Sequence, residues 1–101
     1  MGPRRVGEAK EHELDWWVVR LKIKVVYFAS AREAASTRRE TFHMPAGAGT
    51  SDLALEMVKR HPGLGRVLDS ARFSVNLQVI EARKSLHDGD EVGVLPPLAG
   101  G

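Results

Sequence analysis

The sequence predicts a single α+β domain, in which a mixed β-sheet carries one main helix packed on one face. Three observations predict this class. The chain has 101 residues, which suits one domain with one modest core. Its most hydrophobic strand-like segments lie near its beginning and at its end, over residues 18–28 and 91–95. Between them, residues 50–60 carry apolar side chains at helical spacing.

The first strand is expected over residues 18–28, which are mostly β-branched, aliphatic or aromatic. Apolar and polar residues alternate there, so one face of the strand is buried. Residues 29–35 are good helix formers, in a run long enough for one or two turns. A turn at 36–37 then leads into a second alternating segment, and we expect a second strand over 38–44.

The main helix follows a glycine-containing loop over 45–49. Thr50 or Ser51 is expected to cap this helix, Asp52 suits its positive end, and no full capping box is predicted. The sequence His-Pro-Gly at 61–63 ends the helix. Four residues form its apolar stripe: Leu53, Ala54, Met57 and Val58.

The second half of the chain supplies the remaining strands. We expect a short helical or irregular connection over 64–71, and then a strand over 72–75 with Phe73 and Val75 on one face. Extended structure resumes over 78–81, and the turn residues of 87–90 precede the last strand. The order is β, β, α, β, β, with the first and last strands as the central pair. A β-grasp roll satisfies this arrangement.

Composition excludes several function classes. The chain has no cysteine, so it has neither disulfides nor a thiolate metal site, which fits a cytoplasmic protein. Its four histidines lack metal-ligand spacing, and no metal site is expected. The net charge is only +2 and the charges are interspersed, so nucleic acid is not an expected partner. No apolar run approaches the ~20 residues of a membrane span.

Residues 1–20 are expected to be a flexible extension outside the folded domain, because they are polar and mixed in charge. Trp16 and Trp17 are the exception, since each indole ring carries a large apolar area. Two interpretations stay open for them. They lengthen the first strand or lie over an edge of the core, or they contact a partner.

The C-terminal segment over 95–101 reads Leu-Pro-Pro-Leu-Ala-Gly-Gly. Pro96 and Pro97 fix φ and remove two backbone donors, so they stop the last strand and favour an extended exit. Gly100 and Gly101 have no side chain, so the end of the tail can thread a narrow channel and approach a partner closely. We therefore predict that this tail is the functional segment.

Four segments together resemble the MoaD family, the ubiquitin-like β-grasp small subunits of molybdopterin synthase. They are Val-Val-Tyr-Phe-Ala with Ala-Arg-Glu over 25–33, His-Pro-Gly-Leu at 61–64, Leu-His-Asp-Gly-Asp-Glu-Val at 86–92, and the tail. The Tyr-Phe-Ala and Pro-Pro…Gly-Gly parts are the specific ones. The resemblance covers 21–101, which implies a sulfur-carrier domain over that range with a protruding tail over 95–101.

The resemblance implies a mechanism centred on Gly101. A MoeB-like activating enzyme would use ATP to adenylate the Gly101 carboxylate, and a sulfur donor would convert it to a thiocarboxylate. The tail would then enter a MoaE-like large subunit and give its sulfur to the pterin precursor of molybdenum cofactor. The resemblance also implies that the chain is not catalytic alone and holds no permanent cofactor. The expected partner contacts are the tail and an apolar patch on the uncovered sheet face: Pro96, Pro97, Leu98, Ala99, Phe73, Val75 and Val94.

Two alternatives use the same Gly-Gly end. One is a related sulfur carrier for thiamine synthesis or tRNA thiolation. The other is a ubiquitin-like modifier that is joined through Gly101 to lysines of other proteins.

Overall fold

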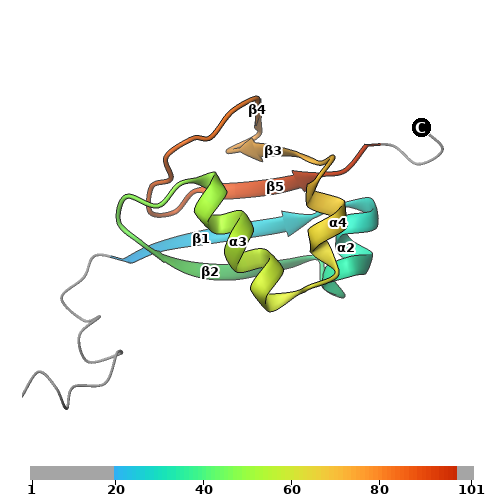
Figure 1. The fold of residues 1–101 in the computed structure, drawn as a ribbon. Helices are drawn as coiled ribbons and strands as arrows, with labels where there is room; N and C mark the ends of the chain where they lie inside the picture. The colour runs from blue at the N-terminus through green and yellow to red at the C-terminus, as the bar shows by residue number, and fades with distance from the viewer. Residues whose placement is uncertain (1–19, 98–101) are drawn as a thin grey trace, which may run out of the picture.

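The computed structural model describes residues 20–97, which form a five-stranded sheet with helices over one of its faces (Figure 1). The helices are α2 (Ala29–Ala35), α3 (Thr50–Arg60) and α4 (Leu64–Leu68). The strands occur in the spatial order β2-β1-β5-β3-β4. Their bounds are β1 (Arg20–Tyr27), β2 (Arg39–Pro45), β3 (Arg72–Val75), β4 (Gln78–Ile80) and β5 (Glu91–Leu95).

The strands that come first and last in the sequence, β1 and β5, are neighbours in the sheet, as predicted. β1 and β5 pair in parallel, with Val25 opposite Val92 and Tyr27 opposite Val94. The β1–β2, β3–β5 and β3–β4 pairs are antiparallel, so the sheet is mixed. Because β1 and β5 run in the same direction, their C-terminal ends lie at the same edge of the sheet. The α+β class and the β-grasp arrangement are confirmed.

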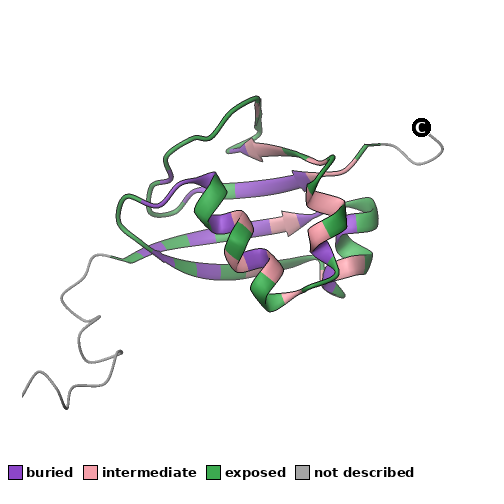
Figure 2. Ribbon diagram, viewed as in Figure 1, coloured by how far each residue is buried: buried purple, intermediate pink, exposed green. Residues whose placement is uncertain are grey.

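The hydrophobic core lies between the sheet and the helices (Figure 2). Alternate residues of β1 face the helices, and Ile23 and Val25 are fully buried there. Leu53 and Met57, four residues apart on α3, are buried against this face. Of the four residues predicted for the apolar stripe, Leu53 and Met57 therefore cover the sheet, while Ala54 and Val58 are only partly buried. The opposite face has no helix over it in the described part of the chain, and we call it the open face.

A polar network ties the end of α3 to β2. The Glu40 carboxylate accepts a hydrogen bond from Arg60 Nη1 at 3.2 Å, and His61 Nε2 lies 2.7 Å from Glu40 Oε2. The Arg60 guanidinium also lies 3.9 Å from the centre of the Phe42 ring, in a cation–π contact. Arg60 is the last residue of α3 and His61 follows it, so these contacts hold the helix end against the strand.

The start of α3 differs from the prediction. The N-cap is Gly49, and neither Thr50 nor Ser51 caps the helix. Thr50 is already helical, and its hydroxyl accepts a hydrogen bond from Lys84 N–H at 3.1 Å instead. Asp52 satisfies the cap, because its Oδ2 accepts the Gly49 N–H at 2.8 Å. That backbone donor, and then Arg83 at 3.3 Å, hold the pKa of Asp52 below its ordinary value.

Two negative findings apply to residues 20–97. No helix within this range has the length and apolar character needed to cross a membrane. Nor do the described side chains include a group of three histidines or carboxylates placed to hold a metal ion.

Candidate functional site

The candidate site begins where β5 ends. Leu95 lies opposite Arg72 of β3, and Phe28 N–H donates a hydrogen bond to the Val94 carbonyl at 3.3 Å. Pro96 is partly buried and Pro97 is exposed. The strand therefore stops at the proline pair, as predicted, because proline has no N–H to continue the ladder.

The rest of the predicted tail, Leu98, Ala99, Gly100 and Gly101, lies outside the described residues. Their roles therefore stay predictions. What the described residues add is the place of departure: the chain leaves the sheet from a central strand, at the edge where β1 also ends.

The apolar patch expected from Phe73, Val75 and Val94 is wrong in its position. Val75 and Val94 are 3% and 0% exposed, and both lie in the core on the helix-covered face. The reason is strand alternation, because neighbouring residues of a strand point to opposite faces. Phe73 pairs with Val94 and Val75 pairs with Val92, so all of them point toward the helices.

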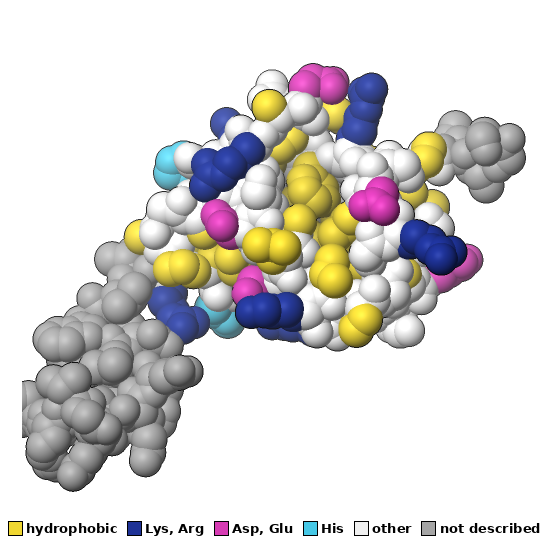
Figure 3. All heavy atoms as spheres, viewed as in Figure 1, with side chains coloured by type: hydrophobic (Ala, Val, Ile, Leu, Met, Phe, Trp, Pro, Cys, Tyr) yellow, Lys and Arg dark blue, Asp and Glu magenta, His cyan; other side chains and the backbone are white. Residues whose placement is uncertain are grey.

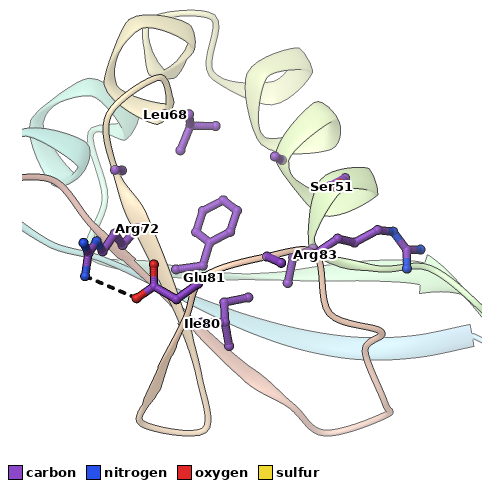
Figure 4. A pocket seen from close by; sticks show the side chains of 11 residues that line it. Ser51, Leu68, Arg72, Ile80, Glu81 and Arg83 are labelled. Atoms are coloured by element: carbon purple, nitrogen blue, oxygen red, sulfur yellow. Dashed lines mark hydrogen bonds and ion pairs between the residues drawn. The ribbon is translucent and has the colours of Figure 1, made fainter.

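Phe73 is half-buried and lines a groove of about 410 Å³ between α3, α4 and the β3–β4 hairpin. Figure 4 shows Leu68 of α4 and Ile80 of β4 on opposite sides of this groove. The Arg72–Glu81 ion pair at its rim, at 3.5 Å, joins two highly exposed side chains, so it adds little stability. The groove thus explains where Phe73 lies, which is on the face away from the expected patch.

The open face carries its own apolar patch. Four residues on this face are successive partners across the sheet: Val26, Gly93, Ser74 and Val79. Phe28, which follows the end of β1, lies over Gly93. Phe28 is 46% exposed and Val79 is 50% exposed. We define the open-face patch by its apolar members: Val26, Phe28, Val79 and Leu95.

Gly93 is what lets the open-face patch lie close to the sheet. A Cβ atom built on Gly93 would lie 2.6 Å from Ser74 Oγ and 3.4 Å from Phe28 Cε2. The first distance is shorter than real Cβ contacts allow, so Ser74 would have to move. The Phe28 ring therefore rests directly on the backbone of β5, two residues before the chain leaves the sheet.

Sequence analysis missed Phe28 and Val79. A usable signal exists for Phe28, because it directly follows Tyr27. When Tyr27 is buried against the helices, an extended Phe28 must point to the open face. Val79 gives no comparable signal, since β4 is three residues long and its facing depends on its register with β3.

Together these features define a class. A β-grasp sheet in which the central last strand is followed by Pro-Pro and Gly-Gly in the sequence is typical of ubiquitin-like proteins. The ThiS family model matches residues 25–101. A molybdopterin synthase sulfur carrier subunit from Chlamydomonas reinhardtii is 40% identical, and the match covers 80% of this chain and 100% of that protein. The chain belongs to the ThiS family and, within it, to the MoaD proteins.

Solved structures agree with this placement. A Pyrococcus furiosus protein described as molybdopterin converting factor subunit 1 has TM-score 0.68 and 36% identity, over 77% of this chain and 99% of that one. SAMP1 from Haloferax volcanii has TM-score 0.71 and 25% identity, over 79% and 99%. A chain in the complex of molybdopterin-converting factor subunits 1 and 2 from Helicobacter pylori has TM-score 0.57 and 26% identity, over 80% and 100%.

Proposed function

We propose that this chain is the sulfur carrier subunit of molybdopterin synthase, and that Gly101 carries the sulfur. One observation carries the proposal: the match to a relative with that name, at 40% identity, covers the whole of that relative. The chain has no cysteine, so its own terminal carboxylate is the available anchor for a sulfur atom.

The chemistry needs an activated carboxylate, because a free carboxylate is a poor acyl donor. A MoeB-like enzyme would join the Gly101 carboxylate to the AMP part of ATP, with release of pyrophosphate. Hydrosulfide, released by a sulfur donor, then attacks the acyl carbon; the bond to AMP breaks and AMP leaves, so that a thiocarboxylate remains at the end of the chain. ATP is bound by the activating enzyme in this scheme, and Gly100 keeps the reacting carbonyl free of a neighbouring side chain.

The open-face patch is the surface that we assign to the large subunit. It lies beside the exit of the tail, so one partner can hold the patch and receive the tail at the same time. Pro96 and Pro97 lie between the open-face patch and the tail, and they restrict the backbone there. This restriction lowers the entropy cost of ordering the tail when Leu98 and Ala99 enter the partner. The Helicobacter pylori complex of subunits 1 and 2 supports a MoaE-like large subunit as this partner.

Intact-protein mass spectrometry tests the carrier step. The chain is incubated with ATP, a MoeB-like enzyme and a sulfur source, and we expect replacement of one oxygen by sulfur, mapped to Gly101. A known MoaD protein in the same mixture is the control for enzyme activity. If that control is converted and this chain is not, the proposal is wrong. The thiocarboxylate form is then mixed with a large subunit and the pterin precursor, and molybdopterin is assayed.

A second role as a protein modifier has one specific observation in its favour, the shared fold with the archaeal modifier SAMP1. Both roles start from the same adenylate and differ in the acceptor, which is sulfur in one case and a lysine amine in the other. Isopeptides that join Gly101 to lysines of cellular proteins would establish the second role. Molybdopterin formation without such isopeptides would support the carrier role only.

A further inference from the structure

The open face carries a cluster of cations on β1 and β2, beside the open-face patch. Even-numbered residues of β1 lie on this face, because the odd-numbered ones are buried against the helices. Lys22 and Lys24 are two of these even-numbered residues, and both are exposed. Arg39 of β2 is also exposed, and it pairs with Val26 across the two strands, so it lies on the same face. We call Lys22, Lys24 and Arg39 the basic strip.

The cations of the basic strip are not neutralised within the part of the chain that the structure describes. None of the three makes an ion pair with a carboxylate of residues 20–97. Glu91 of β5 is opposite Lys24 in the register of the sheet, and Asp88 Oδ1 accepts the Lys22 backbone N–H at 2.7 Å. Even so, neither carboxylate pairs with a lysine ammonium of the strip, so these ammonium groups can bind carboxylates of another protein.

The helix side has a different arrangement of charge. Figure 3 shows this side, on which Lys and Arg side chains lie near Asp and Glu side chains. Two ion pairs there are Lys59–Glu56 at 3.4 Å and Arg83–Asp52 at 3.3 Å. Unpaired cations that are grouped on one face are therefore a feature of the open face.

The position of the basic strip is unfavourable for the isolated sheet. Lys22 and Lys24 lie in β1, which is a central strand. Lysine is depleted in strands, and the lysines that prevent sheets from pairing edge to edge lie on edge strands. Like charges that lie close together on one face also repel each other. The two lysines therefore cost stability without protecting an edge, which favours a role in binding.

The basic strip is continuous with the open-face patch. Val26 belongs to the patch, pairs with Arg39 and is two residues from Lys24. A stable protein interface buries about 800 Å² on each partner, and four partly covered apolar side chains cannot supply this area alone. β4, which contributes Val79 to the patch, is an edge strand, so across the sheet the contact can extend only toward β1 and β2, where the strip lies.

We propose that the basic strip binds an acidic surface of the large subunit, next to the contact that the open-face patch makes. This inference rests on the proposed function and adds a chemical requirement to it, since carboxylates of the partner must face the strip. The patch supplies apolar contact, while the charges increase the rate of association and fix the orientation of the two proteins. Glu91 beside Lys24 favours a protein partner, because RNA or an anionic membrane would repel this carboxylate.

Association kinetics with a MoaE-like large subunit test the proposal. Lys22→Glu/Arg39→Glu reverses two charges of the strip, and Lys59→Glu/Arg66→Glu changes the net charge equally on α3 and α4. At about 0.1 M salt, the first variant should lower the association rate constant at least about tenfold, and the second should lower it by less than about threefold. At about 1 M salt, where the Debye length is about 3 Å, the first variant and the wild type should associate at similar rates.

A variant that preserves charge separates the effect of charge from an effect on the fold. Lys22→Arg/Arg39→Lys keeps both cations, so it should associate as fast as the wild type. All four substituted side chains in these variants are exposed, so each variant is expected to keep the fold. Far-UV circular dichroism and thermal unfolding check this.

Three results overturn the proposal. In the first, Lys22→Glu/Arg39→Glu associates as fast as the wild type. In the second, both charge-reversal variants lose the same amount, which shows an effect of net charge alone. In the third, Lys22→Glu/Arg39→Glu loses binding to RNA or to phosphatidylserine vesicles while its association with the large subunit is unchanged. A wild-type chain that does not bind the large subunit is a distinct result, since it overturns the proposed function and, with it, the partner named here.

Discussion

The Tyr27 hydroxyl donates a hydrogen bond of 2.5 Å to Glu40 Oε2, and so joins β1 to β2 beneath the end of α3. Burial, the hydrogen bond to Glu40 and the Glu40 charge all raise the pKa of Tyr27. Burial raises the pKa of Glu40 too, but hydrogen bonds from Tyr27, His61 and Arg60 outweigh it, and the net pKa of Glu40 is lowered. The folded state therefore favours a charged Glu40 beside a neutral Tyr27.

Stability should depend on Glu40 in a defined pH window. Because its folded pKa lies below the unfolded value of 4.5, its contribution is present above pH 4.5 and is lost as pH falls through the folded pKa. Glu40→Gln should lower the free energy of unfolding by about 1–2 kcal/mol at neutral pH. Urea unfolding of the wild type and of Glu40→Gln, at neutral and at acidic pH, measures this difference in the free energy of unfolding. The difference should be smaller in acid.

Tyr27→Phe is the matched control for that experiment. It removes one donor and keeps the buried ring, while His61 and Arg60 still contact Glu40. We expect Tyr27→Phe to lower the free energy of unfolding by less than Glu40→Gln does. The difference in this free energy between wild type and Tyr27→Phe should also become smaller in acid. A Glu40→Gln difference of the same size at both pH values would contradict the network.

The open-face patch should be required for binding of the large subunit. Phe28→Asp places a charge at the centre of the patch, and we expect a loss of about 2 kcal/mol, or roughly 30-fold in affinity. Leu55→Asp on the helix side is the control, since Leu55 is also exposed and lies on the other face. Isothermal titration calorimetry with a MoaE-like subunit compares the two. Equal losses for both variants would contradict the assignment.

Removal of Gly101 should separate folding from function. Gly101 has no side chain and lies outside the described residues 20–97, so we expect its deletion to leave the melting temperature unchanged. Conversion to a thiocarboxylate should fall below detection, because the reacting carboxylate then lies one residue short. Calorimetry and intact-mass analysis measure the two properties, and Gly2→Ala, at the other end of the sequence, is the control. A shortened chain that still accepts sulfur would show that Gly101 is not the carrier position.

Leu77 lies in a strained turn whose strain can be removed. Asn76 and Leu77 join β3 to β4 with φ values of 50° and 74°, in a two-residue hairpin connection. Left-handed backbone costs an ordinary residue about 1 kcal/mol, while glycine adopts it freely. Leu77→Gly is therefore expected to raise the free energy of unfolding by about 0.5–1 kcal/mol. Leu77→Ala, which keeps the strain and loses the side chain, should not.

The order of the main elements along the chain and the end of the last strand at the proline pair were predictable from sequence, because each depends on a local pattern. Hydrophobic strands at both ends of the domain, and a proline pair after the last strand, are visible without any knowledge of pairing. The side of the sheet that Phe73, Val75 and Val94 face was not predictable, because facing depends on the register of β3 against β5. The helix start was missed for a similar reason, since Thr50 is engaged by Lys84, 34 residues away.

The parallel pairing of β1 with β5 also has a mechanical consequence. When a partner grips the tail and pulls, the force enters the domain along β5, parallel to its neighbour. The force then acts in shear on all the residue pairs between β1 and β5, from Lys24–Glu91 to Tyr27–Val94. These pairs must break together, and they cannot separate one after another from one end. Residues of β3 brace β5 from its other side. A sheet with this pairing resists unfolding when force is applied repeatedly at the C-terminal end of β5.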